Sequence, residues 1–449
     1  MTTVEIIWWC VAGPILFWWV LLALGSAMQA RKFAGLFLRE PREAFETFRP
    51  PAVIVVPCKG ADPQLADNLA AIMRQDYPTP YRVILVAQAE DDPAVPIIRD
   101  AIANAEHDDT AHPAELLISG DAPPNQGQKV WNQVTALKHL GLDRLASADP
   151  SALPAPPSAL APDTAIVFAD SDAVPGPDWL ANLVGPLKQR DKTAVTTGYR
   201  WLVPPPKGTP DPHPQVTAIA SIMNSSVLSF AGTGKFQFAW GGSMAMLAQT
   251  AIDGDLLGMF DGALCDDYQV TRMTHKLGKR VYFVHRCIVD SPDAWSWPGL
   301  RDFAYRQYML TRKYFPGLYL LALTMLWAYP VGFVVSMSSS FVLVPWLIVT
   351  DQPWYAIGIP ALGSAALVML FDKTRHHHRK IAMARALPED IYARLGRVRR
   401  KDAGPTLHWM AIHAYLAIRP MFSNVMTWRG ITYRLHGPQR CERIDPRPT

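Results

Sequence analysis

Residues 317–349 form an apolar stretch of 33 positions that contains no charged side chain. A helix needs about 20 such residues to cross the hydrocarbon core of a bilayer, so this stretch is long for a single span. Two prolines, Pro330 and Pro345, interrupt it, and residues 354–371 form a second, shorter apolar stretch. We therefore predict transmembrane helices within residues 317–371, without a definite number of spans.

A third apolar stretch, residues 4–28, lies near the N-terminus and holds one acid and no base. Its tryptophan pairs are typical of a membrane segment with interfacial anchors. A cleaved signal peptide usually has a basic start and a shorter apolar core, which this stretch lacks. We predict an N-terminal transmembrane helix in residues 1–30. Because Arg31 and Lys32 follow it, the positive-inside tendency places the next segment in the cytoplasm, beside the inner membrane if the source is bacterial.

Residues 50–300 alternate short β-rich runs with helical patterns. The β-rich runs are AVIVVP, YRVILVAQ, AIVFAD, TAVTTGY and VYFVHRCIV, and the helical patterns include PQLADNLAAIMRQ, VWNQVTALKHL and WLANLVGPLKQ. Nearly continuous apolar strands that alternate with helices indicate an α/β domain with a mostly parallel sheet covered on both faces. Ligands of such sheets bind beyond the carboxyl ends of the strands.

The composition agrees with a chain that is part globular and part membrane-embedded. Hydrophobic residues make up 49% and charged residues 18%, and a net charge of +4 is too small to favour nucleic acid as a partner. The 5 cysteines are scattered and never in CxxC spacing, which indicates neither a disulfide framework nor a zinc site. Residues 145–163 are rich in Pro, Ala and Ser and predict a flexible surface insertion.

The C-terminal region, residues 372–449, is basic at its start, with the runs DKTRHHHRK and RLGRVRRK. Such runs again place this side of the membrane in the cytoplasm. Residues 406–427 are apolar but include Arg419 and Pro420, and a charge in the bilayer centre is costly. We therefore expect an interfacial or re-entrant element there rather than a full span.

Two acids follow the apolar run that ends at Ala169. Asp170 and Asp172 are two positions apart, so on an extended chain they point to the same side. Their oxygens suit Mg²⁺ or Mn²⁺, which would bridge the phosphates of a nucleotide-linked substrate. The alternative is a turn with Asp as a helix N-cap, because two prolines follow at once.

A second acidic pair, Asp266 and Asp267, follows Cys265 and precedes a helical pattern. An acidic pair at a helix start often only complements the helix dipole. The functional alternative is a general base held within reach of an acceptor hydroxyl.

The first predicted strand leads into a sharp turn, Lys59-Gly60, where a nucleotide could approach the backbone. At the end of the next strand, Asp91 and Asp92 could accept hydrogen bonds from a base or ribose. Taken singly, each of these features also fits a solvated turn.

Six motifs in this order resemble the ceramide glucosyltransferase family of inverting, A-type glycosyltransferases. The motifs are PCKGADPQLADNLAAIMRQDYP…AEDDPA, GQKVWNQ, FADSD, GGSMAML, CDDYQVTRMTHKLGKR and TWRGITYRL. The resemblance covers most of the chain, including both membrane ends. It implies an A-type glycosyltransferase domain, Rossmann-like with a mostly parallel sheet, between N- and C-terminal transmembrane and interfacial helices.

The resemblance also implies roles for residues. A nucleotide pocket would be lined by Lys59, Gly60, Asp91 and Asp92, with Lys129 near the diphosphate. Asp170 would be the key acid of a Mg²⁺ or Mn²⁺ site and Asp172 its partner. Asp267 would be the catalytic base and Asp266 its neighbour. The last motif adds Trp428 and Arg429 as expected substrate-binding residues.

The family carries a (Q/R)xxRW signature on an interfacial helix, which we place in residues 301–316. The matching stretch is FAYRQYMLTRKYFP, in which Arg306 fits the first position but Met309 and Leu310 replace the Arg and Trp. Either Arg312 supplies the missing cation as a substrate-binding residue, or this branch handles the acceptor differently.

The expected activity is transfer of a sugar from a nucleotide sugar, such as UDP-glucose, to the hydroxyl of a membrane lipid such as ceramide, with inversion. The partners would be the donor, the lipid acceptor and the bilayer. Diacylglycerol or a hopanoid-like lipid would serve equally as acceptor. A processive polysaccharide synthase shares the acidic motifs but needs an intact QxxRW element. A transporter or scaffold with an inactive domain is the non-enzyme alternative.

Overall fold

The computed structural model describes residues 2–38, 43–62, 64–147, 160–232 and 237–444. The chain divides into two compact units, each assembled from segments that are distant in sequence. The α/β unit comprises Glu40–Trp201, Ala231–Ser291 and Asn424–Thr449, and the helical unit comprises Met1–Arg39, Leu202–Phe230 and Pro292–Ser423.

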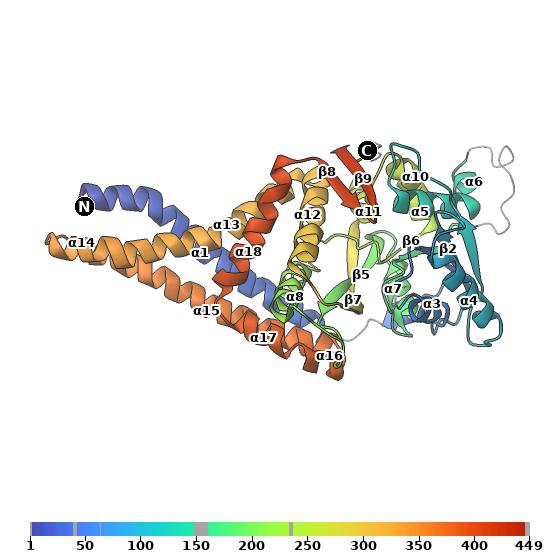
Figure 1. Cartoon of the computed structure of the whole chain (residues 1–449), viewed down its shortest axis with the longest axis horizontal. Helices are drawn as coiled ribbons and strands as arrows, with labels where there is room; N and C mark the ends of the chain where they lie inside the picture. The colour runs from blue at the N-terminus through green and yellow to red at the C-terminus, as the bar shows by residue number, and fades with distance from the viewer. Residues whose placement is uncertain (1, 39–42, 63, 148–159, 233–236, 445–449) are drawn as a thin grey trace. The chain divides into compact units, whose positions relative to one another are not determined.

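A seven-stranded sheet forms the centre of the α/β unit, in the order β3-β2-β1-β4-β6-β5-β7 (Figure 1). The strands are β1 (Ala52–Pro57), β2 (Tyr81–Ala87), β3 (Ala114–Ile118), β4 (Ala165–Ala169), β5 (Thr193–Val203), β6 (Ser243–Leu247) and β7 (Arg280–Pro292). Strands β3, β2, β1 and β4 are parallel, whereas β6 runs antiparallel to β4 and β5. The mostly parallel sheet predicted from the sequence is confirmed.

Helices cover both faces of this sheet. They are α2 (Glu43–Glu46), α3 (Leu65–Met73), α4 (Ala94–Glu106), α5 (Gln128–His139), α6 (Leu142–Ala146), α7 (Trp179–Val184), α9 (Ala248–Asp253), α10 (Leu256–Phe260) and α11 (Asp266–Lys276). Successive side chains of β1 alternate between the two hydrophobic cores: Ile54 packs in the core with α3, α4 and α7, and Val55 in the core with α5, α10 and α11. A strand buried on both faces is apolar throughout, which explains the run AVIVVP.

Two strands of this sheet were not among the predicted β-rich runs. Strand β3 lies at one edge, and β6 lies inside the motif GGSMAML between β4 and β5. Their sequences, AELLI and SMAML, contain few β-branched residues, whereas the equally short β4, AIVFA, contains two. Of the predicted flexible insertion 145–163, residues 148–159 lie outside the described residues.

A second sheet, formed by β8 (Val425–Trp428), β9 (Ile431–Gly437) and β10 (Arg440–Ile444), belongs to the α/β unit. The Arg443 backbone N–H donates to the Pro124 carbonyl (2.7 Å), and that of Cys441 donates to the Gly262 carbonyl (3.2 Å). The Gln128 N–H at the start of α5 donates to the Tyr433 hydroxyl (3.2 Å). Backbone hydrogen bonds thus attach the last strands of the predicted region 372–449 to the rest of the α/β unit.

The helical unit contains the predicted membrane segments (Figure 1). Its helices are α1 (Thr3–Leu36), α8 (Pro214–Leu228), α12 (Trp297–Tyr314), α13 (Pro316–Ser338), α14 (Val344–Val349), α15 (Tyr355–Ala386), α16 (Glu389–Arg394), α17 (Gly396–Ala403) and α18 (Thr406–Ile418). A π-helical turn, Ser339–Leu343, joins α13 to α14, so the helix continues through the stretch that the two prolines were expected to break.

Within the described residues, three helices are long and apolar enough to cross a membrane: Thr3–Leu36, Pro316–Val349 and Tyr355–Ala386. They correspond to the three apolar stretches of the sequence, and they support membrane association. Residues 406–427, predicted to be an interfacial or re-entrant element, contain the 13-residue helix α18 and begin strand β8. A helix of this length is too short for a full span.

The N-terminal helix α1 packs against α13 and α15 within the helical unit. The Trp8 indole N–H donates to the Ser339 hydroxyl (2.7 Å). A Cβ added at Gly332 would lie 2.5 Å from the Trp19 ring, so the glycine permits the close approach of α1 and α13. Small residues at such crossings are typical of helices packed in membranes.

Candidate active site

Five charged residues that the sequence singled out lie near the carboxyl end of β4. Asp170 and Asp172 follow that strand directly, and Asp266 and Asp267 are the first two residues of α11. Lys129 lies in the first turn of α5. The predicted edge of the sheet, where parallel strands end and ligands bind, thus carries the acids that the sequence singled out.

Gly127 fixes the position of α5 relative to the segment before α11. Its N–H donates to the Ala263 carbonyl (2.9 Å), and a Cβ at this position would lie 2.7 Å from a side-chain carbon of Leu264. Only a glycine allows this approach without displacing backbone. The contact brings the first turn of α5 to the first turn of α11.

Lys129 bridges the two acidic pairs. Its ammonium lies 2.8 Å from the Asp170 carboxylate and 3.1 Å from that of Asp266. The Gln133 amide, one turn further along α5, donates to the same Asp266 oxygen (2.7 Å). Burial lowers the pKa of Lys129, but the carboxylates of Asp170 and Asp266 outweigh this effect and raise the pKa above its ordinary value. Lys129 therefore carries a fixed positive charge between the acids.

Arg200 is a further member of the site that the sequence interpretation did not include. It lies on β5, and its guanidinium is 2.6 Å from Asp172 and 3.8 Å from Asp170. It also lies over the Trp240 ring, 5.4 Å from the centroid. The available signal was a cation in the otherwise uncharged strand TAVTTGYRWLV, since a charge in a strand that reads as buried requires a partner.

Burial alone would raise the pKa of Asp170, but the adjacent Lys129 and Arg200 outweigh burial and hold that pKa below its usual value. Asp170 is therefore ionised at neutral pH. An ionised, cation-paired carboxylate can exchange its cation for a metal ion without first losing a proton.

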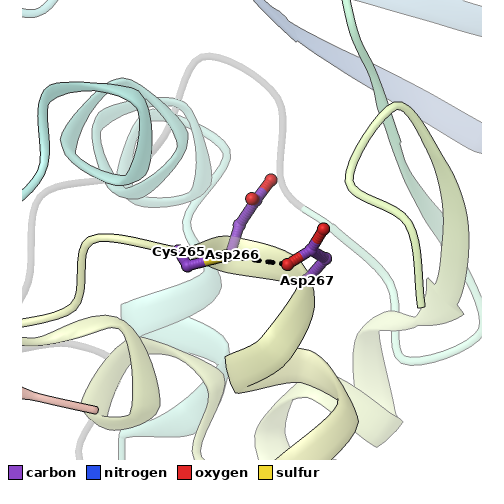
Figure 2. Close-up of side chains that lie close together, drawn as sticks. All are labelled: Cys265, Asp266 and Asp267. Atoms are coloured by element: carbon purple, nitrogen blue, oxygen red, sulfur yellow. Dashed lines mark hydrogen bonds between the residues drawn. The ribbon is translucent and has the colours of Figure 1, made fainter. Parts of the chain in front are cut away.

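Asp267 has different surroundings (Figure 2). The Cys265 thiol donates to its carboxylate (2.8 Å), as does the Tyr268 backbone N–H (2.6 Å), and the Asp266 side chain extends in another direction. Burial and the neighbouring charge of Asp266 raise the pKa of Asp267 to about 6. A carboxylate with this pKa is ionised at neutral pH and is a stronger base than an exposed aspartate.

Two carboxylate sets could hold a divalent cation. Among the described residues, Cys265, Asp266 and Asp267 form a group of three whose ligand atoms all lie within 4.8 Å of one another. Burial raises the pKa of the Cys265 thiol well above its usual value, and a protonated thiol is a poor ligand for hard cations such as Mg²⁺ or Mn²⁺.

The Asp170–Asp172 pair fits such a cation better by its chemistry, because Mg²⁺ sites commonly use one or two carboxylates together with substrate phosphates. A cradle of glycine backbone adjoins it. A Cβ at Gly242 would lie 2.6 Å from an Asp170 oxygen, and a Cβ at Gly241 would lie 2.5 Å from an Asp266 oxygen. The Gly241-Gly242 pair of the motif GGSMAML thus leaves room for both carboxylates.

The turn after β1 places Lys59 and Gly60 beside the end of β2. The Gly60 N–H (φ +76°) donates to the Asp92 carboxylate (2.8 Å), and the Lys59 ammonium donates to the Gln88 side chain (3.1 Å). Asp92 also accepts from the Ala94 N–H at the start of α4 (2.9 Å). One Asp92 oxygen therefore accepts hydrogen bonds from the backbone of both turns, whereas Asp91 is exposed.

The C-terminal sheet brings a second arginine to the acids. Arg429 lies at the β8–β9 turn, where Arg429 (φ +48°) and Gly430 (φ +81°) both adopt left-handed backbone. Its guanidinium is 3.4 Å from Asp62 and 4.0 Å from Asp172. The neighbouring Trp428 is half-buried at the end of β8. The structure thus places Arg429 beside the Asp170–Asp172 pair.

Arg306 and Arg312 lie on α12 in the helical unit. Arg306 stands over the Phe303 ring, 5.7 Å from the centroid. Arg312 donates to the Ser423 carbonyl (3.0 Å) and to the Pro420 carbonyl. These contacts give Arg312 a part in joining α12 to the segment after α18. A role in acceptor binding remains a proposal for both residues.

Comparison with known proteins defines the class. The family model described as "Glycosyltransferase like family 2" matches residues 50–309, more than half of the chain. The chain therefore belongs to the family 2 glycosyltransferases, enzymes that use a nucleotide sugar, and its α/β unit has their A-type fold. None of the curated proteins compared with the chain matches it significantly.

Solved structures resemble it at low identity. A mannosyltransferase from Pyrobaculum calidifontis, in complex with GDP-Man and Mn²⁺, is 17% identical over 92% of this chain and 99% of that one, with a TM-score of 0.44. Glucosyl-3-phosphoglycerate synthase from Mycobacterium tuberculosis is 14% identical over 60% of this chain and 80% of that one, with a TM-score of 0.33. At these scores, nothing about donor, metal or acceptor is transferred from them to this chain.

Proposed function

We propose that this glycosyltransferase transfers a hexose from a UDP-linked donor to the hydroxyl of a membrane lipid of the ceramide type, with inversion at the anomeric carbon. The observation that carries the proposal is the cluster at the end of β4, where Lys129 joins Asp170 to Asp266 and Asp267 stands on the same helix turn. It combines fixed positive charge for a diphosphate with a base for a hydroxyl.

On the donor side, Lys129 and Arg200 are the cations nearest to the acidic pair. They would stabilise the negative charge that develops on the departing nucleoside diphosphate. Asp170 and Asp172 would hold Mg²⁺ or Mn²⁺, which supplies further charge neutralisation on the diphosphate when bound. Lys59, Gly60, Asp91 and Asp92 would contact the nucleotide from the turns after β1 and β2.

On the acceptor side, Asp267 would be the catalytic base. Its carboxylate takes the proton of the acceptor hydroxyl while that oxygen bonds to the anomeric carbon, and the bond from that carbon to the diphosphate oxygen breaks. A single displacement inverts the anomeric configuration. Asp266 would hold Lys129 in place, and its charge supports the basicity of Asp267.

The lipid nature of the acceptor is supported by the three helices in the described part of the chain that could cross a membrane. In the proposed topology, the α/β unit faces the cytoplasm, where nucleotide sugars are made. Arg306 and Arg312 of α12, together with Trp428 and Arg429, would contribute to acceptor or donor binding. An enzyme that acts on a lipid must present its site close to the bilayer surface.

Expression of the full chain in a host that lacks glycolipids, followed by mass spectrometry of the lipid extract, tests this function. The expected product is a new lipid heavier by one hexose, absent from cells that express Asp267→Asn at the same level. Chelation of divalent cations in isolated membranes should stop the transfer, and added Mn²⁺ or Mg²⁺ should restore it. A new glycosylated diacylglycerol or hopanoid would correct the acceptor alone. Release of a long polysaccharide without any new lipid would contradict the proposal in favour of a polymer synthase.

A further inference from the structure

Each of the four carboxylate oxygens of the Asp170–Asp172 pair faces a cation. One Asp170 oxygen lies 2.8 Å from Lys129 and the other lies 3.8 Å from Arg200. One Asp172 oxygen lies 2.6 Å from Arg200 and the other lies 4.0 Å from Arg429. The oxygens that would coordinate a metal ion thus already lie beside positively charged side chains of the chain itself.

Arg200 is the cation that contacts both acids of the pair. Its side chain is 19% exposed, and its position over Trp240 constrains the plane of the guanidinium. Its Nε atom is buried and has no hydrogen-bond partner in the described part of the chain. A buried donor without a partner costs free energy, so the guanidinium is not fully satisfied by the two acids. One donor of the guanidinium is therefore unused in this arrangement.

The charges of the two ligands, the divalent cation and the diphosphate, determine how each binds beside Arg200 and the acidic pair. A divalent cation adds two positive charges beside Arg200 and Lys129, which are already positive. The diphosphate of a nucleotide sugar adds about two negative charges beside carboxylates. Arg200 and Lys129 oppose a divalent cation that binds alone, and the carboxylates oppose a diphosphate that binds alone, in a site of low exposure where charges are weakly screened. The two ligands together add no net charge, so each offsets the repulsion that the other meets.

We propose that Arg200 is a positioning residue that makes binding of the divalent cation and of the nucleoside diphosphate depend on each other. Arg200 neutralises the acidic pair while the site lacks both ligands. When both bind, its guanidinium exchanges Asp172 for a diphosphate oxygen, and the two acids become available to the cation. The planar group is suited to this exchange, since it binds carboxylate and phosphate by the same two-point geometry. This inference rests on the proposed function and specifies how its donor site assembles.

The test measures Mn²⁺ binding to the purified full-length chain in detergent by electron paramagnetic resonance, with and without UDP. In the wild type, UDP should tighten Mn²⁺ binding at least tenfold, and Mn²⁺ should tighten UDP binding by the same factor, as linkage requires. In Arg200→Met, Mn²⁺ alone should bind about tenfold more tightly, because a repelling charge near the acids is gone. The mutual enhancement should shrink accordingly. Arg286→Met, on an exposed residue of β7, is the matched control and should behave like the wild type.

Arg200→Lys and Asp172→Asn extend the test. The lysine variant keeps the charge but lacks the two-point geometry, so its affinity for Mn²⁺ alone should stay near that of the wild type while turnover falls. In Asp172→Asn, UDP should bind more tightly than to the wild type in the absence of metal, because Arg200 loses one carboxylate. Asp172→Asn therefore tests the inference even if Arg200→Met does not fold.

Equal affinity of the wild type and Arg200→Met for Mn²⁺ alone, or unchanged mutual enhancement, would overturn the inference and leave the proposed function intact. For Asp172→Asn, unchanged or weaker UDP binding without metal would overturn it equally. A wild type that binds neither UDP nor Mn²⁺ and makes no glycolipid would instead contradict the proposed function itself.

Discussion

Asp267 depends on its immediate neighbours for the properties of a base. It is held by the Cys265 thiol and the Tyr268 N–H, and burial with the charge of Asp266 raises its pKa to about 6. These effects act in opposite directions, since hydrogen bonds to the carboxylate lower its pKa. The result is a group that can accept a proton near neutral pH and is still largely ionised before it reacts.

Asp267→Asn should lower kcat for sugar transfer by about 10²- to 10⁴-fold, because the amide cannot accept the proton of the acceptor hydroxyl. The active form of Asp267 is the carboxylate, so kcat/KM of the wild type should fall as the pH decreases through about 6 and level off above it. Initial rates against pH measure both effects. Asp100→Asn, at an exposed position of α4, is the control and should leave the rate unchanged. Near-normal turnover of the Asp267 variant would contradict the base assignment.

Gly242→Ala should destabilise the protein by about 1–3 kcal/mol, since the added Cβ would lie 2.6 Å from Asp170 and 2.3 Å from Trp240. Displacement of Asp170 should also weaken donor binding. Chemical unfolding and UDP titration measure the two effects. Gly176→Ala is the matched control, because a Cβ there meets nothing within 4 Å. Equal stability of the two variants would show that the site tolerates a side chain beside Asp170.

At the scale of elements, the site depends on strands that lie far away in sequence. Tyr433 of β9 accepts from the N–H of Gln128, the residue before Lys129, and Arg429 of the same sheet reaches Asp172. The last strands therefore complete the α/β unit after the chain has passed through the helical unit. A truncated chain that ends before β8 would lack this support for α5.

A buried charge cluster connects helices of the helical unit. Asp402 of α17 is fully buried and lies 3.2 Å from Arg379 and 3.6 Å from Arg375, both on α15. The ring of His376 lies 3.1 Å from the same carboxylate. These basic residues belong to the run DKTRHHHRK, so part of the run that indicates the cytoplasmic side by the positive-inside tendency serves internal packing.

Asp402→Ala should cost about 3–5 kcal/mol of unfolding free energy, because it leaves buried arginines without their counter-charge. The matched control is Asp390→Ala, whose carboxylate is 76% exposed and lies 3.9 Å from Arg394. An exposed pair of this kind contributes little, so the control should unfold like the wild type. Thermal unfolding in detergent compares the two variants, and similar midpoints would show that the buried cluster does not stabilise the unit.

At the scale of the whole molecule, the long apolar helices of the helical unit support membrane association. Extraction of cell membranes with alkaline carbonate should leave the full chain in the pellet, because the part of the chain that the structure describes has three helices long and apolar enough to cross a membrane. A peripheral protein held by surface charge is released under the same conditions. Recovery in the supernatant would contradict membrane insertion and, with it, the choice of a lipid acceptor.

Much of the fold could be predicted from the sequence, because its signals are local. The apolar run at β1 indicates a buried strand, and the 33 uncharged positions from residue 317 indicate a membrane segment. The family membership confirms the class of enzyme, whereas the ceramide specificity, the acceptor and the residue roles remain proposals. Strands β3, β6 and the C-terminal sheet were missed. Strands β3 and β6 are poor in β-branched residues, and the strands of the C-terminal sheet lie in a region predicted to be membrane-interfacial.

The apolar segments, the alternation of strand and helix, and the acids that follow the strands can be recognised from the sequence. The electrostatic partners of those acids cannot, because these partners come from other strands and helices and meet the acids only in the folded chain. Arg200 meets Asp170 and Asp172 across the sheet, and Arg429 reaches Asp172 from the far end of the chain. Coulombic and hydrogen-bond interactions depend on the distance between two groups in space, and residues far apart along the chain can be close in the fold.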